Sequence, residues 1–481
     1  MTRRSAGRHA VVTLAGQWIR YVVQIVALVL FSRVLDPSDF GLVSMVTSVV
    51  GVAYVIGDVG LSLAALQARD LTAGQRSNLW WITSAIGIAI GLVVWGLSPA
   101  LAALYDRDAV APVATALAGV FVANGFGGQF RTELNRAQRF TDLAMIDVIA
   151  QLAGLAAGVV VIVCGGSYWG LVVQQLVAAW GTTAMLAARA GWWPGWPDRT
   201  QPMRSLLRFG LFTFGAQVVN YVSSNADAVI IGHRWGASTL GFYNRAFQVA
   251  RMPVQQVAAP LTRVVLPHLV RHRDDPAAFS AAVARGQLVL ATILLGALSV
   301  IAATAPSLTS VALGPGWDEA VPLIRALCLA AALQSLQYIY YWILLAHGRT
   351  EVLFGAELGA RIAMVALMLV AAPHGALWVA LAAAAGQALL LASNVALVGP
   401  RVQIAAGPLL RQASRPVAVF GAACALTWAV STTLPSWSAV PTLLVLLVVW
   451  GAVCAATLVL APVRRDGAAL VAYGRSVLGR S

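Results

Sequence analysis

Charge is scarce in this chain, and lysine is absent from it. Of its 481 residues only 10% are charged and 59% are hydrophobic, and the mean hydropathy is +0.79. All 32 basic residues are arginines. This composition excludes a water-soluble globular protein of this length. It also excludes an ATPase with the GxxxxGK[ST] nucleotide-binding loop, because that loop needs a lysine.

Cysteine is rare as well. The four cysteines lie within or at the ends of apolar segments and form no CxxC pair: Cys164, Cys328, Cys424 and Cys454. Disulfide frameworks and zinc sites depend on closely spaced cysteines or on cysteine–histidine clusters. We therefore predict no metal site and no cofactor.

Long apolar runs occupy most of the chain. An α-helix rises ~1.5 Å per residue, so ~20 apolar residues cross a ~30 Å hydrocarbon core. Fourteen segments reach that length, and the connections between them are short. The predicted spans are 11–32, 40–65, 79–101, 110–130, 143–164, 168–188, 206–231, 240–267, 286–312, 320–346, 352–372, 375–398, 414–434 and 440–462. The sequence therefore predicts an all-α polytopic membrane protein with about 14 transmembrane helices.

The arginines lie mainly in every second connection. With the N-terminus in the cytoplasm, 24 of them fall in inward loops and tails, and 3 fall in outward loops (Arg33, Arg107 and Arg234). Cytoplasmic loops of membrane proteins carry such an excess of basic residues. The distribution predicts that both termini are cytoplasmic, and it explains the net charge of +14 without a nucleic-acid partner.

The chain repeats itself at an offset of 200 residues. Residues 13–41 align with 213–241 without a gap and share seven identities in 29 positions. The identities fall on the first helix of each copy and on the turn after it. Six predicted helices separate the copies, so both copies enter the membrane in the same orientation. Duplicated bundles of this kind are typical of transporters, with the substrate site between the copies.

The repeat predicts the domain organisation. We expect two parallel six-helix lobes, an N-lobe at 1–190 (helices 1–6) and a C-lobe at 206–400 (helices 7–12). A cytoplasmic linker rich in Pro, Gly, Trp and Arg joins them at 191–205. Helices 13 and 14 and a cytoplasmic tail occupy 401–481.

Polar residues line one face of the first helix in each copy. Helix 1 carries Gln17, Arg20 and Gln24 at helical spacing, and helix 7 carries Gln217, Asn220 and Asp227. Lipid offers such groups no partner, so both faces must meet protein or water. Either they hydrogen-bond within each lobe, or they line a central cleft between the lobes. We favour the cleft because the polar face is duplicated.

Several longer motifs fit one family. They are FSRVLDPSDFG within 31–67, FRTELNRAQRFTDLA at 130–144, GGSYWGLVVQQL at 165–176, NADAVIIGHRWGASTLGFYNRAFQVARMP within 225–275, LGPGWDEAVPLIRALC within 313–337 and HGRTE at 347–351. Together these stretches resemble the polysaccharide transport branch of the multidrug/oligosaccharidyl-lipid/polysaccharide flippase superfamily. The resemblance runs over roughly residues 10–400.

The resemblance implies a V-shaped pair of lobes around a central cavity, and alternating access without ATP. It also implies a substrate, an undecaprenyl-pyrophosphate-linked oligosaccharide moved from the inner to the outer leaflet of the bacterial cytoplasmic membrane. No catalytic motif accompanies it, and we predict no enzymatic activity. The expected partners are this lipid-linked oligosaccharide and membrane lipid. Whether other polysaccharide assembly proteins bind the arginine-rich inner loops is left open.

Ionisable residues within the spans are the candidates for function, because an ionised group at the bilayer centre costs ~2.5–3.5 kcal/mol on insertion scales. The guanidinium fork suits a diphosphate, since it donates to phosphate oxygens bidentately. We predict that the substrate cavity is lined by four arginines and three amides: Arg20, Arg251, Arg325, Arg245, Gln17, Gln217 and Asn220. Structural pairing of these arginines with buried acids is the competing interpretation.

The acids in the spans divide into two groups. Asp227 and Asp58 are predicted ion-coupling residues, although a structural role is equally compatible with the sequence. Glu357 and Arg361 stand at i, i+4 and are predicted to form a structural ion pair.

An aromatic run lies in helix 10. Tyr338, Tyr341 and Trp342 share one helical face. Such a face can hold sugar rings, but ordinary packing is the favoured interpretation.

Three other functions remain open. A multidrug-type cation antiporter of the same superfamily would favour acidic cavity residues, whereas the spans hold five arginines and four acids. A membrane glycosyltransferase or polysaccharide polymerase would place acidic residues in a long outward loop, and the longest outward loops here are about ten residues. A non-transporting scaffold is the least favoured.

Overall fold

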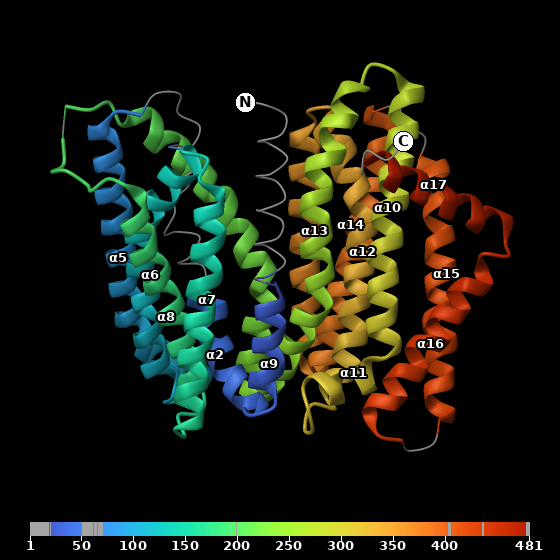
Figure 1. Ribbon diagram of the computed structural model, residues 1–481, viewed down its shortest axis with the longest axis horizontal. Coiled ribbons are helices and arrows are strands. Elements are labelled where there is room, and N and C mark those ends of the chain that lie inside the picture. The colour runs from blue at the N-terminus through green and yellow to red at the C-terminus, as the bar shows by residue number, and fades with distance from the viewer. Residues whose placement is uncertain are drawn as a thin grey trace. The chain divides into compact units, whose positions relative to one another are not determined.

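The computed structural model describes the backbone of residues 19, 21–50, 61, 65, 71–198, 200–402, 406–434 and 437–477, with the side chains of most of them; those of 204–224 and of several shorter stretches are outside the description. Throughout this part of the chain every regular element is helical (Figure 1). Ten of the described helices are long and apolar enough to cross a membrane. The prediction of an all-α, multi-pass membrane protein is therefore confirmed, while the total of fourteen spans stays a prediction.

The chain forms two compact units, Met1–Gly241 and Phe242–Ser481. These two units are defined by contacts between residues, whereas the predicted lobes are defined by the sequence repeat. The division therefore does not test the predicted lobe boundaries, which stay a prediction. Unit 1 contains a short helix at Tyr21–Ser32, α2 (Pro37–Val50), α5 (Ala73–Tyr105), α6 (Val110–Arg136), α7 (Phe140–Val163), α8 (Trp169–Ala190) and the first part of α9 (Arg204–Arg271). Within it α6 packs against α5 and α8, and α7 packs against α8.

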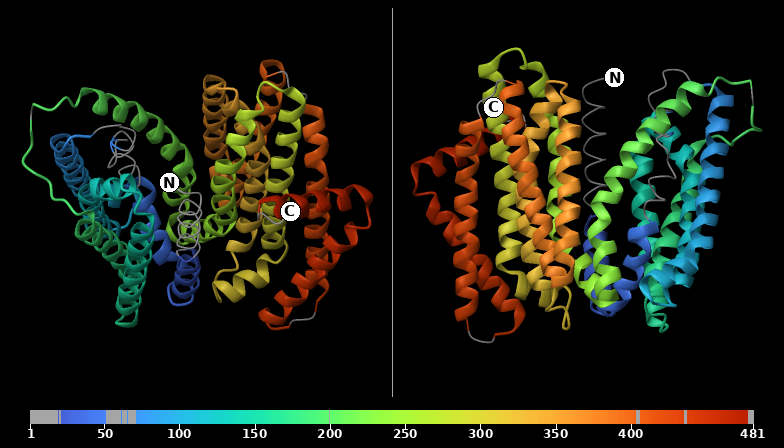
Figure 2. Two further views of the ribbon diagram at one scale, coloured as in Figure 1. Left: turned by 45° about the horizontal axis from the view of Figure 1, so that its top comes forward. Right: turned by 180° about the vertical axis from the view of Figure 1, so that it is seen from behind.

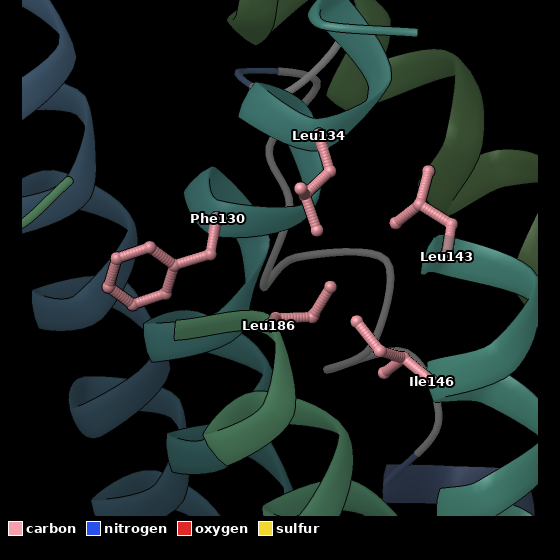
Figure 3. Close-up of a cluster of buried hydrophobic side chains, with 5 residues drawn as sticks. All are labelled: Phe130, Leu134, Leu143, Ile146 and Leu186. Atoms are coloured by element: carbon pink, nitrogen blue, oxygen red, sulfur yellow. The ribbon is translucent and has the colours of Figure 1, made fainter. Parts of the chain in front are cut away.

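The core of unit 1 contains a cluster from three helices. Leu134 of α6, Leu143 and Ile146 of α7 and Leu186 of α8 point toward one another, and Phe130 of α6 belongs to the same cluster (Figure 3). All five side chains are buried. Lipid is as apolar as these side chains, so close packing rather than the hydrophobic effect holds the helices together here.

Unit 2 is built around α12. It contains the rest of α9, α10 (Pro276–Ala303), α11 (Ala305–Ala312), α12 (Ala320–Ala346), α13 (Thr350–Ala371), the 3-10 turn η1 (Ala372–His374), α14 (Ala376–Val402), α15 (Ala406–Thr433), α16 (Ala439–Thr457) and α17 (Ala461–Val477). The α12 helix packs against α10 and α14, α13 packs against α14, and α15 packs against α10 and α16 (Figure 2).

Some helices begin or end at positions other than those of the predicted spans, because a proline or a capping side chain sets the helix end. The span predicted at 286–312 is divided, because α10 ends at Ala303 and α11 begins at Ala305 with Pro306 in its first turn. The start of α10 at Pro276 is fixed by Asp275, whose side chain accepts hydrogen bonds from the Ala277 and Ala278 amides at 3.1 Å.

The α9 segment holds two of the predicted spans, 206–231 and 240–267. They are separated at Gly236, whose backbone is non-helical with φ 78° and ψ −175°. A positive φ is accessible to glycine at little cost. The chain therefore turns there, at the position predicted to connect the two spans.

The turns that follow the first helix of each repeat cross each other within unit 1. A Cβ built on Gly41 would overlap the carbonyl of Ala237, and one built on Gly241 would overlap the carbonyl of Pro37. These contacts are reciprocal under the offset of 200, because position 41 corresponds to 241 and position 37 to 237. The same two helices also approach each other at Gly232 of α9, where a Cβ would lie 3.5 Å from the Met45 Cγ atom of α2. We call this contact of α2 with α9 the glycine crossing.

Candidate binding site

An arginine of α9 and two tyrosines of α12 form the site that we consider in unit 2. The Arg251 guanidinium lies 5.1 Å from the centre of the Phe247 ring, one turn earlier on α9. Its charge acts on the phenol of Tyr338, whose ring centre is 6.1 Å from that of Tyr341. Among the described residues no acid is within ion-pair distance of Arg251. The guanidinium is thus half-buried beside the Phe247 ring, and no carboxylate of the described part of the chain pairs with it.

A buried tryptophan holds these tyrosines in place. Trp342 is completely buried, and its indole Nε1 donates to the Thr262 Oγ1 of α9 at 2.8 Å. The Tyr338 ring centre lies 6.5 Å from that of Trp342. Trp342 therefore ties α12 to α9, whereas Tyr338 and Tyr341 keep part of their surface exposed.

The third side of the site comes from α13. Glu357 and Arg361 lie on one helical face with the Arg361 Nη2 and Glu357 Oε2 atoms 3.6 Å apart, as their spacing allows. The Glu357 charge acts on both tyrosine phenols. Because Arg361 offsets Glu357, Arg251 supplies the net positive charge of the cluster.

This arrangement can bind a group that carries both negative charge and hydroxyls. A guanidinium offers five N–H donors in a planar fork, and two phenols donate and accept hydrogen bonds. Exposed aromatic rings also give apolar faces for a sugar ring. We refer to Arg251, Tyr338, Tyr341 and the Glu357–Arg361 pair as the α9–α12–α13 cluster.

The other two predicted arginines of unit 2 lie elsewhere. Arg325 donates from Nε to the Ala302 carbonyl at 3.3 Å, and its guanidinium lies 5.1 Å from the centre of the Trp428 ring of α15. It precedes Tyr338 by 13 residues, ~20 Å along α12. Arg245 donates from Nη1 to the Gln248 Oε1 at 2.8 Å. Arg251 and Arg325 therefore do not contribute to the same site.

Several predicted residues belong to unit 1. Asp227 is buried, 7% exposed, and its carboxylate accepts from the Ala228 amide at 2.8 Å. The backbone of Gln217 and Asn220 is helical, but their side chains lie outside the described residues. The positions of Gln17, Arg20 and Asp58 are also outside the described residues. Their predicted roles stay predictions.

Two acids of α7 pair with arginines, which sequence reasoning expected only in general terms. The Arg131 guanidinium of α6 forms a bidentate pair with Asp147 of α7, with the longer contact at 3.3 Å. Asp142, in the first turn of α7, pairs with Arg139 at 2.7 Å and with Arg189 at 3.1 Å. The sequence could not show that Arg131 approaches Asp147 or that Arg189 approaches Asp142, because these partners lie on different helices.

The fold defines the class of protein as a multi-pass helical membrane protein. The model of a family described as "Polysaccharide biosynthesis protein" matches residues 30–322, more than half of the chain. The chain belongs to this family. The resemblance to polysaccharide transporters of the flippase superfamily, read from the motifs, is thereby confirmed.

Curated relatives carry names from polysaccharide biosynthesis. The chain is 23% identical over 336 residues to the lipopolysaccharide biosynthesis protein WzxC of Escherichia coli (strain K12). This match covers 69% of this chain and 68% of WzxC. It is 24% identical over 304 residues to the teichuronic acid biosynthesis protein TuaB of Bacillus subtilis (strain 168), covering 63% of each. It is 23% identical over 308 residues to the succinoglycan biosynthesis transport protein ExoT of Rhizobium meliloti (strain 1021), covering 64% of this chain and 62% of that one. The chain thus spans about two thirds of the length of these relatives.

Solved structures show the same fold at low identity. The lipid II flippase MurJ in an inward closed conformation matches with a TM-score of 0.73 and 11% identity, covering 93% of this chain and 99% of that one. An inward-facing multidrug resistance transporter of the MATE family matches with a TM-score of 0.65 and 15% identity, covering 82% of this chain and 98% of that one. At these identities the likeness shows the fold alone.

Proposed function

We propose that this protein is a flippase that moves an undecaprenyl-pyrophosphate-linked oligosaccharide from the inner to the outer leaflet of the cytoplasmic membrane by alternating access. Membership of the polysaccharide biosynthesis family supports a role in glycan assembly. The names of WzxC, TuaB and ExoT place those relatives in biosynthesis or transport of surface polysaccharides. The fold shared with MurJ and with a MATE transporter supports transport rather than synthesis.

The α9–α12–α13 cluster is the observation that carries the substrate assignment. Arg251 would bind a phosphate oxygen of the pyrophosphate, and the phenols of Tyr338 and Tyr341 would hydrogen-bond the first sugars. The Glu357–Arg361 pair would leave that positive charge unopposed. Arg20, Arg245 and Arg325 remain candidate phosphate ligands, Gln17, Gln217 and Asn220 candidate cavity residues, and Asp227 and Asp58 candidate coupling residues.

The charge of this cluster opposes the main alternative. A multidrug-type antiporter of the same fold binds cations, and the guanidinium of Arg251 would repel them across a low-dielectric site. The likeness to MATE transporters is one of fold and does not bring their substrates with it. We therefore favour an anionic, glycan-bearing substrate.

Glycan export by variants tests the proposal. Arg251→Ala should abolish export while protein abundance stays near normal, and Arg251→Lys should restore it only in part because an ammonium cannot form the bidentate contact. The matched control is the double variant Arg131→Gln with Asp147→Asn, which removes an ion pair of unit 1 outside the cluster and should retain export. Full export by Arg20→Ala, Arg251→Ala and Arg325→Ala alike would overturn the phosphate-binding assignment.

A further inference from the structure

The segment between α8 and α9, residues 191–203, is fastened along the side of α5, and we call it the strap. The Asn78 side chain of α5 donates to the Asp198 carbonyl at 2.6 Å and accepts from the Asp198 amide at 2.8 Å. The Gly195 amide donates to the Ser77 Oγ at 3.0 Å, and its carbonyl accepts from the Trp81 Nε1 at 2.9 Å. Gly195 and Asp198 are thereby both hydrogen-bonded to side chains of α5.

The strap lies beside the first turns of α5 rather than beyond the end of the helix. Trp81, which holds Gly195, follows the start of α5 at Ala73 by eight residues, ~12 Å along the axis. Trp81 itself is 40% exposed, so this is the lateral face of a membrane-spanning helix. Figures 1 and 2 show the segment looping out beside the end of α5.

The strap holds three tryptophans, of which Trp192 is partly buried and Trp193 and Trp196 are mostly exposed. Trp192 packs on Phe130, with ring centres 5.4 Å apart, and the Arg76 guanidinium lies 4.4 Å from its ring centre. Trp193 and Trp196 are 76% and 89% exposed. Each is followed by a proline, Pro194 and Pro197, which limits the freedom of the backbone that presents it. Both rings therefore present most of their surface outward, and the Trp193 ring centre also lies 6.1 Å from that of Phe130.

The charge around the strap is positive. Residues 189–208 contain four arginines and a single acid, Asp198. Hydrogen bonds from Thr200 and Gln201 hold the pKa of Asp198 below its usual range, so this acid stays ionised. Its carboxylate accepts these hydrogen bonds from within the strap itself. At the same end of unit 1, Arg139 and Arg189 share one acid, Asp142, so these three residues add one net positive charge.

We propose that the strap is a lipid-binding anchor that places Trp193 and Trp196 in the headgroup layer of the membrane and favours anionic phospholipid. Tryptophan is enriched at this depth because its ring is apolar and its N–H is polar. A lateral position at the end of an apolar span puts both rings at the boundary between headgroups and acyl chains. Anionic headgroups complement the arginines that flank the strap in the sequence, Arg189, Arg204 and Arg208. This inference does not depend on which substrate the protein transports.

Fluorescence quenching in nanodiscs tests the position of the strap. In a background with the native cysteines replaced, Trp193→Cys and Trp196→Cys are each labelled with an environment-sensitive nitrobenzoxadiazole probe. Lipids with a nitroxide near the headgroup should quench both probes strongly, and aqueous iodide should quench them weakly. Strong iodide quenching without nitroxide quenching would overturn the proposal and would indicate a surface open to a protein partner.

Lipid-dependent stability tests the preference for anionic headgroups. Phosphatidylglycerol should raise the Tm of the unmodified chain above its value in phosphatidylcholine. The double variant Trp193→Ala with Trp196→Ala should lose at least half of that rise. Trp437→Ala removes an exposed tryptophan outside the strap, so this variant should show the full rise in Tm. An equal rise in all three proteins would overturn the anionic preference, even if the probes report insertion.

Discussion

At the scale of single residues, surroundings separate arginines that look alike in the sequence. Arg251 and Arg325 both fall in predicted spans, yet one lies beside tyrosines of α12 and the other lies over Trp428 with a hydrogen bond to Ala302. The contrast extends to the aromatic run of α12. Trp342 is completely buried and bonded to Thr262, as the packing interpretation expects, while Tyr338 and Tyr341 remain partly exposed.

Tyrosine-to-phenylalanine variants separate binding from packing in this run. Tyr338→Phe and Tyr341→Phe keep the ring and remove the hydroxyl, so abundance should stay normal. If the hydroxyls bind the cargo, the rate of export should fall roughly two- to tenfold, the value of one hydrogen bond. Rates measured with a lipid-linked oligosaccharide in proteoliposomes check this.

The control for these variants is the neighbouring tryptophan. Trp342→Ala removes the bond to Thr262 and a fully buried ring, so it should lower protein abundance and thermal stability. An unchanged export rate in both phenylalanine variants would favour pure packing for the whole aromatic run.

A second residue-scale prediction concerns the pair of Arg131 and Asp147. Removing one partner leaves a charge without its neutralising group, so Arg131→Gln alone should lower abundance. The double variant Arg131→Gln with Asp147→Asn should recover it, since two neutral amides remain. Abundance in membranes, followed by fluorescence-detected size exclusion, measures both. A double variant as poor as the single one would contradict the interpretation of the pair as structural.

At the scale of elements, the apolar runs of the sequence predict the helices well because length and hydropathy suffice to define a span. The sequence also predicts the break in α9, since Gly236 stands where a positive φ is needed. It misses α17, because three arginines and two glycines within 461–477 lower its hydropathy below that of a span. It also misses the course of the strap, which depends on side chains more than 100 residues away in α5.

The glycine crossing gives an element-scale prediction. Gly41→Ala and Gly241→Ala each place a methyl group against a backbone carbonyl, so overpacking should cost about 1–3 kcal/mol of stability. The double variant should cost less than the sum of the two, because both methyl groups force apart the same pair of segments. Thermal unfolding in detergent measures all three.

Gly96 provides the matched control for this prediction. It also lies in a helix of unit 1, but a Cβ there would meet no atom within 4 Å. Gly96→Ala should therefore be neutral or stabilising, since alanine is the better helix former by about 1 kcal/mol. Equal losses at positions 41 and 96 would show that the close approach at the crossing is not the cause.

At the scale of the whole molecule, the alternation of arginine-rich and arginine-poor loops predicts the topology. We expect fourteen spans and two cytoplasmic termini. In intact cells an impermeant maleimide should label a cysteine introduced at Ser436 and should not reach one at Ser481. Labelling at position 481, or protection at position 436, would overturn the orientation. What the sequence could not supply is the set of contacts between helices, and the α9–α12–α13 cluster exists only through them.

The glycine crossing has one further consequence. Its two contacts exchange under the offset of 200, so each segment offers the other the same patch that it receives. That is the pattern of an isologous interface between identical subunits, here enclosed in one chain. In a true homodimer any substitution appears on both sides at once. In this single chain a substitution at position 41 leaves position 241 unchanged. The two contacts of the glycine crossing can therefore become different from each other by one substitution at a time.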